Sequence, residues 1–181
     1  MEVSVYHAAV AIDPDQLDIV LHPAPVLRQK TARIGEITDE VRAVADRMLW
    51  LMHDAEGIGL AAPQVGIPWR LFVTRDPAVP DGDGGLVFIN PEIETLDSEL
   101  VEDTEGCLSL PGVEVTVRRP VGVRVRALTL EGLHMEEDRC DHFARVYQHE
   151  LDHLDGVLII DRMTTMDRLR NRKAIRDLER R

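Results

Sequence analysis

The sequence predicts an α+β domain, in which antiparallel or mixed β-sheets pack around a central helix with an HExxH motif, with a helix nearer the N-terminus and another at the C-terminus. Three observations support this fold class. Apolar residues recur at helical spacing early in the chain, β-branched runs fill its middle, and helical spacing returns towards the end. Because 181 residues with 44% hydrophobic side chains can bury a substantial core, we expect residues 1–181 to form a single domain.

The first predicted element is a helix over residues 38–55. Thr38 is a suitable N-cap, and Asp39 and Glu40 suit the positive end of the helix dipole. Gly57 is placed to end the helix. The apolar residues that recur along one face are Val41, Val44, Ala45, Met48, Leu49 and Met52.

Several segments in the middle of the chain are rich in β-branched residues and partly alternate, which indicates strands. They are residues 70–74, 86–90, 113–117 and 121–130, and residues 91–101 also have strand character. Glu131 and Gly132 are predicted to form a hairpin turn. Residues 76–85 are rich in Pro, Gly and Asp, which predicts a surface loop within the domain.

Two helices are predicted in the last third of the chain. Helical spacing returns between residues 138 and 154, and Gly156 can end that helix. A last helix is predicted from Thr164, whose spacing to Asp167 matches an acidic variant of the capping box. Residues 164–181 hold seven basic and three acidic side chains, so this segment carries +4 and the remainder −16 of the net −12.

The composition argues against several classes of protein, namely nucleic-acid binders, disulfide-rich proteins and membrane proteins. The net charge of −12 disfavours the main body as a nucleic-acid binder, so specific DNA is not an expected partner. Two cysteines are too few for a disulfide scaffold. The acidic first 20 residues argue against a secretory or transit peptide, and no apolar run approaches the roughly 18 residues of a membrane span. We therefore expect a cytoplasmic protein without a membrane partner.

The strongest chemical signal is HELDH, at residues 149–153. Side chains four residues apart share one face of a helix, so His149 and His153 can bind one metal ion. The adjacent Glu150 can act as general base and later as general acid. The alternative is a helix that merely carries two histidines and an acid. The other histidines have no distinctive spacing, and we expect surface or packing roles for His7, His22, His53, His134 and His142.

A catalytic metal site of this kind needs a third protein ligand. The acids downstream of the motif have no distinctive setting; they are Asp155, Asp161, Asp167, Asp177 and Glu179. The thiolate of Cys107, in the segment EGCLS, is a softer ligand and is preferred, and three ligands leave a fourth position open. A buried structural cysteine is the alternative, and Cys140 is expected to be of that kind.

The segment GIGLAAPQVG, residues 57–66, directly follows the first predicted helix. It lacks the spacing of a phosphate loop or a dinucleotide motif. Gly57 and Gly59 would let the backbone run close to a ligand, and the amide of Gln64 offers a neutral donor. The alternative is a plain turn.

Taken together, GIGLAAPQ, EGCLS and QHELDHLDG resemble, in this order, the three signature motifs of peptide deformylases. Each motif is intact. The resemblance implies an α+β fold and a metallohydrolase acting on linear amides, which removes the N-formyl group from the initiator methionine of nascent polypeptides and releases formate. It implies one Fe²⁺ per chain, for which Zn²⁺, Ni²⁺ or Co²⁺ can substitute at a site formed by Cys107, His149 and His153.

The resemblance also assigns roles within the site. Donors to the oxyanion are the Gln64 side chain and the Leu108 backbone N–H, and Gly59 binds the peptide backbone. Hydroxide generated at the metal is expected to attack the formyl carbon, while Glu150 returns a proton to the departing amine. Ile58 is expected to help line an apolar pocket for methionine, and a tight pocket at the metal would reject longer acyl groups.

Two rival functions stay open on sequence alone. A small zinc endopeptidase shares HExxH but would need a downstream ligand and a longer cleft, and a metal-stapled binding module would need a fourth protein ligand. The basic segment 164–181 is interpreted either as a solvated helix face or as a site that docks the protein on the RNA-rich ribosome, beside its formyl-methionine substrates.

Overall fold

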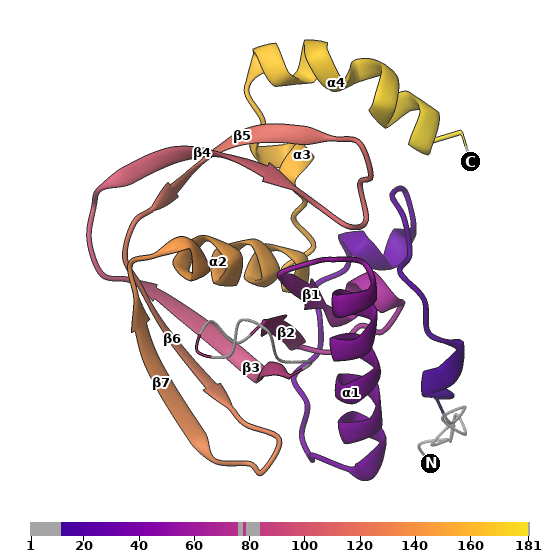
Figure 1. Cartoon of the computed structure of the whole chain (residues 1–181), viewed down its shortest axis with the longest axis vertical. Coiled ribbons are helices and arrows are strands. Elements are labelled where there is room, and N and C mark those ends of the chain that lie inside the picture. Colours follow the sequence, from indigo (N-terminus) through magenta and orange to yellow (C-terminus); the bar gives the residue numbers. More distant parts are fainter. Residues whose placement is uncertain (1–11, 76–77, 79–83, 181) are drawn as a thin grey trace, which may run out of the picture.

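The protein is described here by a computed structural model that covers residues 12–75, 78 and 84–180. Its strands form a five-stranded sheet in the order β1-β2-β3-β6-β7 and a two-stranded ribbon of β4 and β5 (Figure 1). The strands are β1 (Gly59–Ala61), β2 (Leu71–Arg75), β3 (Gly85–Thr95), β4 (Leu100–Gly106), β5 (Glu114–Pro120), β6 (Val123–Leu128) and β7 (His134–Arg139). All of these strand pairings are antiparallel. The α+β prediction is confirmed.

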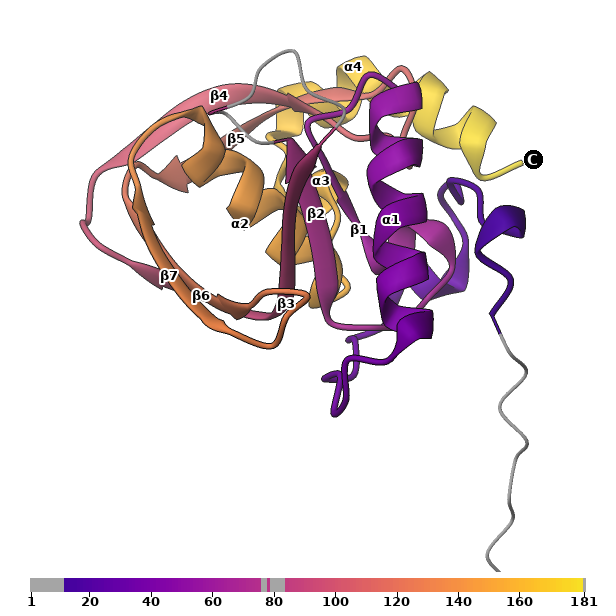
Figure 2. The ribbon, with the colours of Figure 1, turned by 60° about the horizontal axis from the view of Figure 1, so that its bottom comes forward.

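The helices divide between the core and the periphery. Helix α2 lies between the five-stranded sheet and the β4–β5 ribbon, α1 packs beside β1 and β2, and α4 lies outside β5 (Figures 1 and 2). The described helices are η1 (Pro14–Gln16), η2 (Pro25–Arg28), α1 (Asp39–Asp54), η3 (Ala62–Val65), α2 (His142–Leu154), α3 (Ile159–Arg162) and α4 (Thr165–Leu178), the η elements being 3₁₀ turns. None of them is both long and apolar enough to cross a membrane.

Helix α1 begins as predicted but ends differently. The Thr38 hydroxyl accepts the Val41 N–H at 3.4 Å, which confirms the N-cap. The left-handed residue after the helix is Glu56, with φ 54°, and not Gly57. Gly57 donates its N–H to the carbonyl of Met52 at 2.8 Å. A Cβ at residue 57 would lie 2.8 Å from Cδ1 of Leu108, so that side chain would have to shift to accommodate any residue other than glycine.

Helix α2 carries the HELDH motif and is fixed at both ends. Asp141 caps its start by accepting the Phe143 N–H at 3.0 Å, and Gly156, with φ 74°, follows its end as predicted. Tyr147 anchors the helix to the sheet, since its ring lies 4.8 Å from that of Phe88, centroid to centroid. The motif therefore sits on a helix that is capped at its start and packed against the sheet.

The strand predictions were partly correct. Residues 91–101 do not form one strand: β3 ends at Thr95, and a turn in which Asp97 accepts the Glu99 N–H precedes β4. The hairpin at Glu131 and Gly132 is confirmed, with Gly132 at φ 78°. Most of the predicted 76–85 loop lies outside the described residues, and Gly85 belongs to β3.

Helix α4 follows the predicted start. Thr164 accepts the Asp167 N–H at 3.1 Å, and the Asp167 carboxylate accepts the Thr116 N–H of β5 at 3.1 Å. Asn171 donates its side-chain N–H to the Glu114 carbonyl at 2.7 Å. These bonds seat the helix on the outer strand of the ribbon.

Candidate metal centre and active site

Three side chains from two distant segments converge beside a pocket that Cys107 and His149 help to line. The Nε2 atom of His153 lies 3.3 Å from the sulfur of Cys107 and 3.2 Å from Nε2 of His149. All three donor atoms lie within 4.8 Å of one another. Cys107 follows the end of β4, and both histidines lie on α2, so the fold joins the two motifs.

The spacing and chemistry of these donors fit a divalent metal ion. Two imidazole nitrogens about 2.1 Å from one tetrahedral ion lie about 3.4 Å apart, and nitrogen and sulfur ligands lie about 3.6 Å apart. The observed separations of 3.2 Å and 3.3 Å are close to these values. Thiolate with two imidazoles suits zinc, iron, nickel and cobalt. In the described part of the chain no fourth His, Cys, Asp or Glu joins this group.

The two imidazoles have different electrostatic settings. Burial, followed by the nearby charge of His149, holds the pKa of His153 well below its ordinary value, so this ring is neutral. Burial also favours the neutral form of His149, but its hydrogen bonds with Cys107 and Glu105 outweigh this and raise its pKa to about 10. Because metals bind the neutral ring, metal loading must release that proton.

A buried ion-pair network orients His149. Its Nδ1 atom lies 3.0 Å from Glu105 Oε2, and Arg119 donates to both oxygens of the same carboxylate, at 2.6 Å and 2.9 Å. Arg119 also donates to Asp152 at 2.8 Å. Burial raises the pKa of the Glu105 carboxyl, but the hydrogen bonds from Arg119 and His149 outweigh it and hold that pKa well below its usual range. The network thus orients the His149 ring so that its Nε2 atom faces the other two candidate ligands, Cys107 and His153.

Glu150 lies beside the ligand group in a nearly dry setting. It is 4% exposed, and its Oε2 atom has no hydrogen-bond partner within the described residues. Burial, partly opposed by the charges of His149 and Arg119, raises the pKa of Glu150 to about 7. A carboxyl with such a pKa can both accept and donate a proton near neutral pH.

Two groups near the metal-ligand candidates are hydrogen-bond donors, the Gln64 side-chain amide and the Leu108 backbone N–H. The side-chain amide of Gln64 donates to the Cys107 sulfur at 3.6 Å and to the Ser109 hydroxyl at 3.2 Å, while its oxygen accepts the Ala61 N–H at 2.8 Å. The Leu108 N–H has no acceptor among the described residues. Gln64 and Leu108 therefore both carry N–H groups near the candidate metal ligands.

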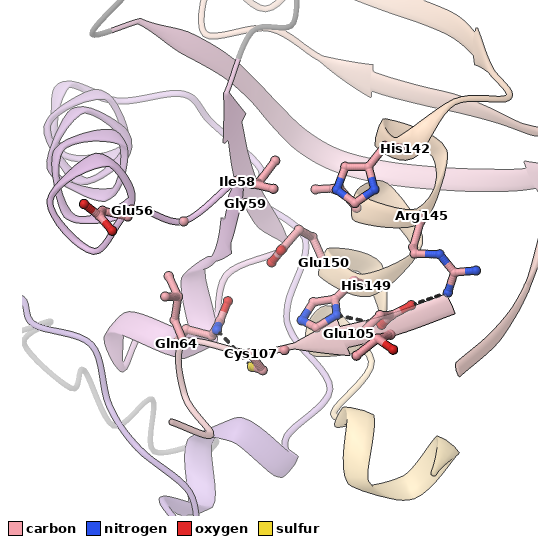
Figure 3. Close-up of a pocket in the computed structure, with 15 residues that line it drawn as sticks. Glu56, Ile58, Gly59, Gln64, Glu105, Cys107, His142, Arg145, His149 and Glu150 are labelled. Carbon is pink, nitrogen blue, oxygen red and sulfur yellow. Dashed lines mark hydrogen bonds and ion pairs between the residues drawn. The ribbon is translucent and has the colours of Figure 1, made fainter. Parts of the chain in front are cut away.

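The pocket above these groups has a volume of about 420 Å³. Figure 3 shows Gln64, Cys107, His149 and Glu150 around a common space. Ile58, 40% exposed, and Gly59 line one side, and residues 104–107 line the other. The pocket thus lies between the free edge of β1 and the free edge of β4.

The edge of β1 presents backbone groups to this pocket. Arg75 donates its N–H to the Ile58 carbonyl at 2.9 Å, so residue 58 is a bonded position of the β1–β2 ladder. Since bonding alternates along an antiparallel edge, the N–H and C=O of Gly59 face away from β2. These groups are available to an extended chain.

Every predicted site residue lies at or beside this pocket: Ile58, Gly59, Gln64, Cys107, Leu108, His149, His153 and Glu150. Sequence reasoning gave no role to Glu105 or Arg119, and it did not place His142 and Arg145 on the pocket wall. The position of Glu105 inside the EGCLS motif was a signal for it. The expectation that Cys140 is a buried structural cysteine is wrong, because Cys140 is exposed; it also lies outside the metal-ligand group.

Comparisons with known proteins identify the family of this chain. The family described as Polypeptide deformylase matches residues 16–169. The chain is 46% identical over 152 residues to a peptide deformylase of Afipia carboxidovorans, covering 83% of this chain and 88% of that one. It is 44% identical to a peptide deformylase of Alkalilimnicola ehrlichii, covering 91% of each chain.

Solved structures give the same answer. A plant peptide deformylase superposes with a TM-score of 0.87 at 37% identity, covering 94% of this chain and 92% of that one. A peptide deformylase of Synechococcus elongatus, solved in complex with actinonin, has a TM-score of 0.81 at 40% identity, covering 98% and 93%. With its motifs, fold and converging donors, the chain belongs to the peptide deformylase family of metal-dependent hydrolases.

Proposed function

We propose that the chain removes the N-formyl group from the initiator formyl-methionine of nascent polypeptides, releasing formate, with one metal ion held by Cys107, His149 and His153. The convergence of these three donors beside the buried Glu150 carries the proposal. When bound, the cation supplies a Lewis acid and lowers the pKa of a water molecule towards about 7. The family match spans residues 16–169, so we propose that the chain acts as a single catalytic domain.

Glu150 moves the proton in this scheme. Its carboxylate takes a proton from the attacking water and passes it to the amine nitrogen as the C–N bond breaks. The raised pKa, about 7, suits both steps, because the acid and base forms are then both populated near neutral pH. The products are formate and a free methionyl amine.

Gln64 and Leu108 stabilise the charge that develops on the formyl oxygen. Hydrogen bonds to Cys107 and Ser109 hold the side-chain amide of Gln64 beside the ligand group, and Leu108 directly follows the ligand Cys107 in the chain. Hydrogen-bond donors that are already fixed in a buried site stabilise the charge of a transition state far more than donors in water do.

The strand edges bind the peptide. An extended substrate can bond the outward N–H and C=O of Gly59 and lie between β1 and β4. The methionine side chain then occupies the pocket beside Ile58. A formyl carbon bears only hydrogen, so a narrow space at the ligands admits it and rejects acetyl and longer groups.

We propose iron as the native metal, and the only basis for this choice is the family resemblance. The donor set alone does not select Fe²⁺, because the general affinity order places nickel, cobalt and zinc above it at such a site. Protein purified in air is expected to contain Zn²⁺, Ni²⁺ or Co²⁺ in place of iron.

The decisive experiment is anaerobic purification with Fe²⁺, metal quantification, and a formate-release assay on formyl-Met peptides. Stoichiometric metal with formate release supports the proposal. Cleavage of internal peptide bonds without formate would instead identify an endopeptidase. Tight metal binding with neither activity would identify a structural metal, although the described residues place no fourth donor in the group.

We further propose that α4 docks the protein on the ribosome. Six basic side chains of α4 and its C-terminal extension are exposed: Arg168, Arg170, Arg172, Lys173, Arg176 and Arg180. Two apolar side chains, Met166 and Leu169, are each 65% exposed on the same helix. Deleting residues 166–181 should abolish co-sedimentation with ribosomes at low salt. Unchanged co-sedimentation would show that α4 is a solvated face.

A further inference from the structure

Strand β4 forms one wall of the active-site pocket but buries almost none of its own side chains. Only Glu105 is buried, and the other residues of the strand are exposed. Its partner β5 buries Val115, Val117 and Arg119, so β5 is anchored in the interior. Beyond the hydrogen-bond ladder with β5, the position of β4 over α2 therefore depends on polar contacts.

The free edge of β4 presents backbone groups to the pocket. Val121, just after β5, donates its N–H to the Glu99 carbonyl at 3.1 Å, so residue 99 is a bonded position of the ladder. Since bonding alternates along antiparallel strands, the N–H and C=O groups of Thr104 and Gly106 face away from β5. Both residues line the pocket, so an extended peptide can pair with β4 as well as with β1.

One side chain of α2 ties both strands of this ribbon to the helix. Arg145 donates through Nη2 to the Val101 carbonyl of β4 at 2.8 Å and through Nη1 to the Val117 carbonyl of β5 at 3.0 Å. Its Nη1 atom also donates to Oε1 of Glu105 at 2.7 Å, a bond that is drawn in Figure 3. The Arg145 side chain is only 11% exposed. Three bonds from one guanidinium therefore fasten the ribbon to α2.

The contacts of Arg145 differ from those of a residue that binds substrate directly. Arg145 lies one turn before His149 on the same face of α2, and the two side chains hold opposite oxygens of the Glu105 carboxylate. Both Nη atoms of Arg145 are directed at the protein. The guanidinium is planar, so it reaches carbonyls on two strands at once, which the single ammonium of a lysine does not match.

We propose that Arg145 is a positioning residue for the peptide, because it holds the free edge of β4 where an extended substrate can pair with it. The formyl end must reach the ligand group, and Cys107 directly follows β4. The peptide would thus run from Gly106 back towards Thr104, and the residues after methionine would lie along the part of β4 that Arg145 fastens. This inference rests on the proposed deformylation and adds a residue that neither holds the metal nor moves the proton.

Loss of Arg145 should raise KM more than it lowers kcat, and the rise should grow with peptide length. For formyl-Met-Ala-Ser, Arg145→Met should raise KM about tenfold, the value of one charge-assisted hydrogen bond, and lower kcat less than about twofold. For formyl-Met amide, which is too short to follow β4, KM should rise less than about twofold. Arg145→Lys keeps the charge beside Glu105, so its KM for the longer peptide should be intermediate.

Arg70 provides a matched control. It is 13% exposed and donates to the Pro91 carbonyl at 3.2 Å and to Asp155 at 2.9 Å. Like Arg145, it joins a backbone carbonyl and a carboxylate, but it does not line the active-site pocket. Arg70→Met should therefore lower the urea midpoint about as much as Arg145→Met, without changing KM for either substrate.

The test is steady-state formate release by the metal-loaded full chain, with metal content measured on the same samples. Calorimetric titration with Met-Ala-Ser, the deformylated product, measures peptide binding without turnover, and Arg145→Met should weaken it about as much as it raises KM. Equal rises in KM for the two substrates, a fall in kcat alone, or the same KM changes in Arg70→Met would overturn the proposal. If the parent chain released no formate, the proposed function would fail, and product binding by the Arg145 variants would still decide this role.

Two variants keep the result separate from misfolding and from metal loss. Arg145→Lys retains a cation beside Glu105, so it tests the role if Arg145→Met does not fold. Loss of metal from Arg145→Lys would instead assign Arg145 to the support of His149 through Glu105, and would overturn a role in peptide binding.

Discussion

Gly59 and Glu150 occupy adjoining space so closely that a side chain on one excludes the other. A Cβ at residue 59 would lie 2.5 Å from Oε1 of Glu150 and 2.9 Å from its Cδ. The φ of Gly59 is not in the left-handed region, so space, and not backbone conformation, requires glycine. The GIGLAAPQ motif therefore packs against the QHELDHLDG motif at the Glu150 carboxylate, which we propose carries the proton.

Gly59→Ala should impair turnover without loss of metal. The new methyl group must displace the Glu150 carboxylate, so formate release should fall at least tenfold and at most by the roughly 10²- to 10⁴-fold that the proton carrier contributes. Gly35→Ala is the matched control, because nothing lies within 4 Å of its Cβ and its φ is ordinary. Comparable rates for Gly59→Ala and Gly35→Ala would contradict the assignment.

Glu150→Ala should keep the metal and lose roughly 10²- to 10⁴-fold in turnover. Glu150 has no place among the three ligands, so metal content should stay near one per chain. Combining Glu150→Ala with Gly59→Ala should add almost nothing to the loss, since both changes act on one group. A near-normal rate for Glu150→Ala would refute its role.

Cys107→Ser should weaken metal binding, because a hard hydroxyl replaces a soft thiolate. The sulfur lies 3.3 Å from His153 Nε2, so the change strikes the ligand group directly. Metal content after dialysis against a mild chelator measures the effect, with Cys140→Ser as control, because Cys140 is exposed and lies outside the group. Equal retention of metal by the two variants would remove Cys107 from the site.

Arg119→Met should destabilise the fold by about 3–5 kcal/mol, because it leaves the buried charge of Glu105 without its main partner. Both side chains are at most 5% exposed. Arg124→Met removes the Arg124–Asp138 pair at the surface and should change the urea midpoint little, since water screens exposed ion pairs. Arg119→Met should also weaken metal binding, because Glu105 orients His149. Equal urea midpoints would show that the network is not stabilising.

Local signals in the sequence located the helices, but contacts between distant residues completed the site. The caps at Thr38 and Thr164 and the spacing of HELDH were sufficient, because they act within one or two helical turns. The role of Glu105 depends on a partner 14 residues away and another 44 residues away, which no local pattern shows. His22 had no distinctive spacing, and only folding places it beside α4.

The sequence also failed to predict two strands, β7 and β1. β7 is HMEEDR, whose acids oppose arginines of β6, as in the pair of Asp138 with Arg124 at 2.6 Å. Such a strand is polar because neighbouring charges compensate one another across the sheet, and its sequence alone gives no apolar alternation. β1 has only three residues and exists because β2 lies beside it.

The seating of α4 on β5 should be sensitive to acid. Asp167 is 3% exposed, and its carboxylate accepts the Thr164 hydroxyl at 2.7 Å and the Thr116 N–H at 3.1 Å. The Thr164 and Thr116 hydrogen bonds lower the pKa of Asp167 from the ordinary value of 3.8. A carboxyl with a lowered folded pKa stabilises the fold above its unfolded pKa and loses this contribution as the pH falls through the folded pKa.

Asp167→Asn should therefore be less stable than the parent at about pH 7, and the difference should shrink at about pH 3 and below. Urea denaturation of the metal-free chains at both pH values measures the difference without interference from metal release. Asp177→Asn, on the exposed side of the same helix, should show no such pH dependence. If the Asp167→Asn difference were constant with pH, the ionisation of Asp167 would make no contribution to stability, and the destabilisation would come only from replacing a carboxyl oxygen by an amide nitrogen.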